Sequence, residues 1–182
     1  MAEPQQFEAF MQQYQNMVFS TAMRLLANQT DAEDIAQETF LRAYEHFDEI
    51  RQSPTAGGWL KRVATNLCLN HLSRYRARWS FFSDLLGSQH EADSEPIEFA
   101  APDDLSEKLE IADRHEVVEH ALQKLPTAQR VSLVLYHLEG LRYEEIAAKL
   151  NVSLGKVKTD IFRAREALRK KLRARLAEDV VT

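Results

Sequence analysis

The sequence predicts an all-α protein made of two small helical domains joined by an acidic linker. Only five glycines and five prolines occur among the 182 residues, so few positions favour turns. Apolar residues recur every three or four positions near both ends of the chain, which is the period of an amphipathic helix. Residues 84–113 instead hold ten acidic side chains and one lysine, a composition that extends a segment by self-repulsion. We therefore expect domains over residues 1–80 and 107–182, with a linker over residues 81–106.

Three helices are predicted in the first domain. The apolar face of the first helix comprises Phe7, Phe10, Met11, Tyr14, Met17 and Val18. A second helix is expected to start at Thr30, because residues 30–33 have the form of a capping box. Its core stripe comprises Ala32, Ile35, Ala36, Thr39, Phe40, Ala43, Tyr44 and Phe47. A third helix is expected to start at Ser53-Pro54, with Pro54 in its first turn.

The predicted outer face of the second helix carries acidic and amide side chains around a leucine. It comprises Asp34, Gln37, Glu38, Leu41 and Glu45. An acidic patch with a central leucine suits a protein interface. The alternative is that Leu41 is an isolated surface leucine, which is common in proteins.

The stretch of the third helix from Trp59 to about Arg78 is predicted to be basic on its outer side. Its inner side comprises Leu60, Val63, Ala64, Leu67, Cys68, Leu72 and Tyr75, and its outer side Arg62, Asn66, Asn70 and Ser73. Residues 51–83 contain six cations and no anion: Arg51, Lys61, Arg62, Arg74, Arg76 and Arg78. Amide side chains both donate to and accept from base edges, and the nearby Phe47, Trp59 and Tyr75 could stack on unpaired bases. The alternative is a basic surface helix with a structural Trp59.

The second domain is predicted to contain a helix-turn-helix. Ile146, Ala147 and Leu150 form the inner face of a short helix, Asn151 and Val152 the turn, and Ser153 the N-cap of the next helix. The long helix that follows has an apolar stripe of Leu154, Val157, Ile161, Ala164, Leu168 and Leu172. Its opposite face is expected to present Lys156, Thr159, Asp160 and Arg163 to base edges.

The charge of this segment also indicates DNA binding. Residues 140–175 hold eleven cations and four anions, although the whole chain has a formal net charge of −5. Such a local excess of positive charge is the electrostatic footprint of a phosphate-binding surface. The alternative is a solvated amphipathic helix.

Other classes of protein find little support in the sequence. The single cysteine, Cys68, cannot form an intramolecular disulfide, and no secretory leader or membrane-length apolar run is visible, so a cytoplasmic protein is expected. His115 and His120 are five residues apart, unlike the four-residue spacing of a zinc-binding helix. No catalytic motif or phosphate loop is visible, and we expect neither an enzyme nor a bound metal or cofactor.

Three motifs in order resemble the bacterial sigma factors of the extracytoplasmic-function group, group IV. They are D-A-E-D-I-A-Q-E-T-F-L-R-A-Y at 31–44, W-L-K-R-V-A-T-N-L-C-L-N at 59–70, and the segment 125–168 from L-P-T-A-Q-R to R-A-R-E-A-L. The resemblance implies a region 2-like bundle and a region 4-like helix-turn-helix domain. It also implies a factor that binds core RNA polymerase through the largest-subunit clamp helices and the flap, and recognises promoter DNA.

The resemblance also implies roles for individual residues. The residues implied in core binding are Asp34, Gln37, Glu38 and Leu41. Those implied in reading the −10 element and capturing a flipped base are Arg62, Asn66, Asn70, Arg74 and Arg76. Those at the −35 reader are Lys156, Lys158, Thr159, Asp160, Arg163 and Arg165, among which Arg165 and Lys158 are expected to contact phosphate.

The chain departs from the family pattern at Asp160, where arginine is common. A carboxylate can accept from cytosine N4, so the −35 preference is expected to differ. The loop at 51–58 varies in the family, so a −10 preference cannot be transferred. The resemblance also implies that the acidic linker threads into the polymerase, where cationic surfaces would attract it. Two alternatives stay open, namely a stand-alone helix-turn-helix regulator and an RNA-binding or scaffold protein. The sequence leaves open the promoters, the inducing signal and whether an anti-sigma factor binds.

Overall fold

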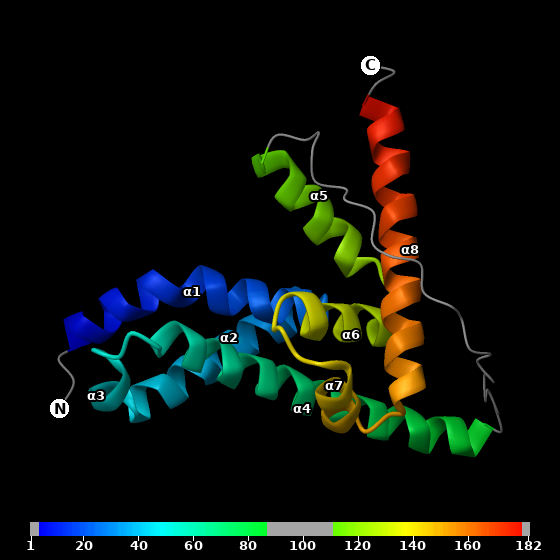
Figure 1. Ribbon diagram of the computed structural model, residues 1–182. Helices are drawn as coiled ribbons and strands as arrows, with labels where there is room; N and C mark the ends of the chain where they lie inside the picture. Colours follow the sequence, from blue (N-terminus) through cyan, green and yellow to red (C-terminus); the bar gives the residue numbers. More distant parts are fainter. Residues whose placement is uncertain (1–3, 87–110, 180–182) are drawn as a thin grey trace. The chain divides into compact units, whose positions relative to one another are not determined.

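The computed structural model describes residues 4–86 and 111–179, and the side chains at 75–86, 111–114 and 175–179 lie outside this description. The chain divides into two compact units, Met1–His90 and Glu91–Thr182. All secondary structure in the described residues is helical, as the sequence predicts (Figure 1).

The described residues of the first unit form four helices. They are α1 (Pro4–Leu26), α2 (Gln29–Glu45), α3 (Phe47–Ile50) and α4 (Ala56–Leu86). Helices α1, α2 and α4 each pack against the other two (Figure 1). Their shared core includes the fully buried Val18, Ala43, Leu60 and Ala64. The rings of Phe10 and Phe47 extend this core, with centroids 5.4 Å apart.

Three expectations for the first unit were wrong in detail. Helix α2 is capped by Asn28 and not by Thr30: Asn28 Oδ1 accepts from the Asp31 backbone N–H at 3.0 Å. Pro54 lies before α4 and not in its first turn, because Ser53 to Ala56 form a hydrogen-bonded turn ahead of the helix. Tyr44 was expected in the core but is 52% exposed.

Helix α4 continues to Leu86, beyond the boundary expected at residue 80, and the expected linker residues 87–106 lie outside the described part of the chain. Near the start of α4, Gly57 lies close to α1. A Cβ atom at this position would lie 3.1 Å from Tyr14 Cε1, tighter than ordinary van der Waals contact. The absence of a side chain at Gly57 therefore permits the close approach of α4 to the Tyr14 ring.

In the second unit, residues 111–179 also form four helices. They are α5 (Ile111–Gln123), α6 (Thr127–His137), α7 (Tyr143–Leu150) and α8 (Leu154–Asp179). Helix α8 packs against the other three. Residues 130–135 of α6 are all buried, including Arg130, whose Nη1 donates to the Leu125 carbonyl at 3.0 Å. Burial lowers the pKa of Arg130.

Ser132 on α6 is 1% exposed, and its hydroxyl has no hydrogen-bond partner in the described structure. An unpaired buried hydroxyl lowers stability because its hydration is lost without replacement. Ser132→Ala is therefore expected to raise the free energy of unfolding by about 1 kcal/mol, measured by urea denaturation of the full chain. The exposed Ser73 supplies the control, since Ser73→Ala gains only helix propensity. A drop in stability for Ser132→Ala would mean that the hydroxyl is satisfied.

Candidate polymerase and DNA interfaces

The outer face of α2 carries all four residues expected to contact polymerase. Asp34 and Gln37 are exposed, Leu41 is 64% exposed, and Glu38 is half exposed. Ile35, Thr39, Phe40 and Ala43 are buried on the other side of the helix, which fixes its phase. Glu38 accepts from Arg42 Nε at 3.0 Å, one turn along the same face. The face thus combines acidic groups with an exposed leucine.

Leu41 also borders a groove between α1 and α2 that the sequence did not predict. The groove has a volume of about 770 Å³. Its apolar lining comprises Phe7, Met11, Phe19, Ala36, Phe40, Leu41 and Tyr44. Tyr44 lines this groove instead of the core, and its ring meets the edge of Phe7 at a centroid distance of 5.0 Å. An apolar groove beside acidic groups suits the apolar and basic side chains of a partner.

The outer face of α4 presents cations and amides, as expected. Arg62, Asn66, Asn70 and Arg74 are exposed, whereas Ala64, Leu67 and Cys68 are buried on the opposite side. Arg76 also belongs to α4, but its side chain lies outside the described residues. These four side chains are spaced about one helical turn apart, so they line one side of α4 along which a nucleic-acid strand could run.

The aromatic residues near this face differ from expectation. Phe47 is 2% exposed and belongs to the core, so it is not available to stack on a base. Trp59 is partly exposed and meets the His46 ring at a centroid distance of 5.8 Å. The Tyr75 side chain lies outside the described residues.

The helix-turn-helix is built from local capping interactions. The Arg142 backbone N–H donates to Glu145 Oε2 at 2.7 Å and so anchors the start of α7. Asn151 ends α7 in the left-handed conformation (φ 53°), which asparagine tolerates better than most residues. Ser153 Oγ accepts from the Lys156 backbone N–H at 3.1 Å, as its predicted N-cap role requires.

Packing of α6 and α7 on α8 buries part of the predicted inner faces. Ile146, Val157, Ile161 and Ala164 are each 0–1% exposed, whereas four more of the predicted residues are only partly buried, namely Ala147, Leu150, Leu168 and Leu172. Leu154 was expected in this stripe but is 37% exposed, because it lies in the first turn of α8, where the helix has just left the turn. Packing against α7 therefore fixes the orientation of α8 and of its outer face.

The predicted base-facing side of α8 is only partly correct. Lys156 and Arg163 are exposed and Lys158 is half exposed. Asp160 and Thr159 were expected to face outward, but they are 5% and 8% exposed. Asp160 lies one turn from both Val157 and Ala164, beside the buried stripe, and Lys156 Nζ lies 2.6 Å from both of its carboxylate oxygens.

Arg165 was expected to contact phosphate, but its guanidinium is held within the second unit. Nε and Nη2 donate to His137 Nε2 at 3.2 and 3.0 Å, and Cζ lies 5.5 Å from the Tyr136 ring centroid. Tyr136 in turn packs on Tyr143, with centroids 4.7 Å apart. This cluster links α6, α7 and α8. Sequence reasoning missed it because His137 and Arg165 are 28 residues apart.

The Arg165 contact requires a neutral His137. Burial, followed by the charge of Arg165, lowers the pKa of His137 from its ordinary value of 6.5. As pH falls below about 6.5, the unfolded chain binds a proton at this position before the native chain does. The stabilisation from neutral His137 is therefore present above that pH and is lost as pH falls through the lower native pKa.

Wild-type Tm is accordingly expected to fall relative to that of His137→Gln on acidification, because glutamine can still accept from Arg165 but does not titrate. Thermal unfolding of both full-length proteins across this pH range tests the prediction. If the Tm values of wild type and His137→Gln changed in parallel with pH, His137 would not contribute to the pH dependence of stability.

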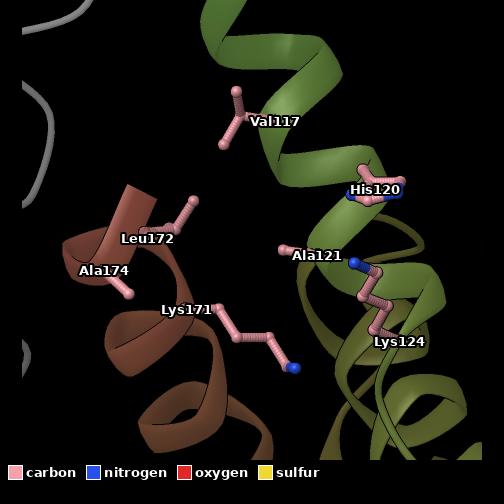
Figure 2. Close-up of a pocket in the computed structure, with 7 residues that line it drawn as sticks. All are labelled: Val117, His120, Ala121, Lys124, Lys171, Leu172 and Ala174. Carbon is pink, nitrogen blue, oxygen red and sulfur yellow. The ribbon is translucent and has the colours of Figure 1, made fainter. Parts of the chain in front are cut away.

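A second, smaller pocket lies between α5 and α8. Its volume is about 240 Å³. Val117 and Ala121 point from α5 towards α8, and Leu172 lies on the facing side (Figure 2). His120, Lys124 and Lys171 surround these apolar groups, and the Lys171 side chain extends towards α5 (Figure 2). The lining thus combines apolar groups with a histidine and two lysines.

Within residues 4–86 and 111–179 no cluster of three or more histidine, cysteine, aspartate or glutamate side chains could hold a metal ion. None of the helices in this part of the chain is long and apolar enough to cross a membrane.

Comparison with known proteins shows the family to which the chain belongs. Residues 10–93 match the family model for sigma-70 region 2, and residues 115–168 match sigma-70 region 4. The chain is 33% identical to the ECF RNA polymerase sigma factor SigW of Bacillus subtilis over 162 residues, 88% of this chain and 85% of SigW. It is 32% identical to the RNA polymerase sigma-H factor of Pseudomonas aeruginosa over 179 residues, 94% and 89% of the two chains.

Among solved structures, the chain is similar to the sigma factor RpoE from Bartonella quintana, crystallised with the anti-sigma factor NepR. The TM-score is 0.48 and the identity 23%, over 92% of this chain and 96% of that one. The two family models and the sequence relatives agree with the helix-turn-helix and the region 2-like bundle described above. The chain therefore belongs to the extracytoplasmic-function sigma factors, the initiation factors that direct RNA polymerase to promoters.

Proposed function

We propose that the chain divides promoter recognition among three surfaces. The α2 face of Asp34, Gln37, Glu38 and Leu41 docks on the clamp helices of the largest polymerase subunit. The α4 face of Arg62, Asn66, Asn70, Arg74 and Arg76 reads and melts the −10 element. The exposed part of α8, chiefly Lys156, Lys158 and Arg163, reads the −35 element, and Arg165 supports it from the Tyr136–His137 cluster.

The observation that carries this proposal is the separation of charge between two helices of the first unit. Helix α2 exposes acidic groups around Leu41, whereas the exposed side of α4 carries cations and amides. An acidic apolar face is repelled by phosphate and suits a protein, and a cationic amide face suits a nucleic-acid strand. One small bundle can therefore engage polymerase and DNA at the same time.

The pocket between α5 and α8 supports a second polymerase contact, at the flap. Val117, Ala121 and Leu172 can contact an apolar side chain, and Lys124 and Lys171 can pair with acidic groups beside it. With contacts at both units, the polymerase holds the two DNA readers on one surface. Each reader then binds at a high effective concentration of its own promoter element.

The chain is proposed to act in the cytoplasm, without catalytic activity or cofactor of its own, as a subunit of the polymerase. The sequence relatives are sigma factors, so a stand-alone regulator is not needed to explain the helix-turn-helix.

Transcription in vitro from a randomised promoter pool tests this function. The purified chain with core polymerase is expected to select promoters that share a −10 and a −35 element. The chain alone is expected to bind duplex DNA weakly, because each reader contacts few base pairs. Tight sequence-specific binding by the chain alone, with no promoter selection by the mixture, would support a stand-alone regulator instead.

A further inference from the structure

The Lys156–Asp160 pair lies at the end of α8 that is proposed to meet the −35 element. Lys156 Nζ is 2.6 Å from both Asp160 oxygens. The two partners differ in burial: the Lys156 side chain is 43% exposed and the Asp160 side chain 7%. The carboxylate is therefore the fixed partner, and the ammonium is the one that solvent or DNA can reach.

Helix stability does not explain this arrangement. Lys156 is in the first turn of α8, where the helix dipole disfavours a cation. A cation four residues before an anion is also the weaker order for a pair on a helix. Because the carboxylate is buried, separating the pair would leave an uncompensated buried charge, which is costly. The ion pair is thus expected to persist when α8 approaches DNA.

We propose that Asp160 is a positioning residue that holds Lys156 as a single, directed hydrogen-bond donor for one base of the −35 element. This inference rests on the proposed role of α8. The lysine ammonium has three donors, and at least one remains after it has engaged the carboxylate. Its charge is neutralised by Asp160, so Lys156 does not serve as a counter-charge for a phosphate. The remaining N–H suits a base that presents acceptors in the major groove, and guanine, with O6 and N7, suits it best.

Lys158 provides the contrast on the same helix. It is half exposed, and in the described part of the chain no acidic side chain is paired with it. Lys158 can therefore neutralise a phosphate. Its loss is expected to lower the salt slope of promoter binding, which is the steepness with which the logarithm of the binding constant falls with the logarithm of salt concentration, by about one.

The experiment measures promoter binding by the complete holoenzyme over a range of salt concentrations, on a library of −35 sequences. Asp160→Asn frees the Lys156 charge. It is expected to strengthen binding to all sequences, to raise the salt slope by about one, and to weaken the guanine preference at one position several-fold. The double variant Lys156→Gln/Asp160→Asn removes the pair without changing net charge. It is expected to lose the same preference with an unchanged salt slope.

Two results would overturn the inference. A double variant that lowers the salt slope as much as Lys158→Gln would show that Lys156 contacts a phosphate. Base preferences unchanged in both Asp160 variants, with circular dichroism confirming the fold, would show that the pair is only structural. A different result would contradict the proposed role of α8 itself: Lys158→Gln and Arg163→Ala would then also leave −35 binding unchanged.

Discussion

Leu41→Asp is expected to weaken binding to core RNA polymerase roughly 30- to 1,000-fold, a loss of about 2–4 kcal/mol, as for a buried interface anchor. Leu41 is 64% exposed in the free chain and borders the apolar groove between α1 and α2. A carboxylate at this position would lose its hydration in the complex and add charge to a face that is already acidic. Competition with a labelled sigma factor for core polymerase measures the effect.

The fold should tolerate this change, because the Leu41 side chain is largely in solvent. Tm and the helical circular dichroism signal are expected to stay near those of wild type. Gln13→Asp is the matched control: it adds the same charge to an exposed position of α1 that does not line the groove. Unfolding of Leu41→Asp would show that Leu41 stabilises the bundle, and equal loss of binding in both variants would show only a general effect of charge.

Asn66→Ala and Asn70→Ala are each expected to make the free energy of open-complex formation less favourable by about 1–3 kcal/mol, the range for a good amide contact to a base. Both side chains are exposed on α4, four residues apart on one face. Extruding a base costs a few kcal/mol, so an amide that captures it acts at the melting step. Permanganate reactivity of promoter thymines reports melting, and filter binding of closed complexes at low temperature reports initial binding.

Arg74→Gln supplies the contrast on the same face. Arg74 carries charge and is expected to act on the backbone, so its loss should weaken closed and open complexes alike. If the asparagine variants reduce closed-complex affinity as much as permanganate reactivity, they do not act in melting.

Local interactions made much of this protein predictable from its sequence. The phases of α2 and α4 follow from apolar residues at helical spacing, and Leu41, Asn66 and Asn70 are exposed as that spacing predicts. The turn at Asn151 and the cap at Ser153 depend on groups within four residues, so their chemistry could be read directly. The three sequence motifs were also sufficient to indicate the family.

Tertiary structure decided what periodicity cannot supply. The groove beside Leu41 exists because α1 lies along α2, and Tyr44 borders it although its position in the helical repeat predicts a core residue. Arg165 bonds to His137 on another helix, and Asp160 is covered although its side of α8 was expected to be open. Helical spacing predicts on which side of its helix a side chain lies. Whether that side chain is buried, and which residues it contacts, depends on residues distant in the chain that packing brings together.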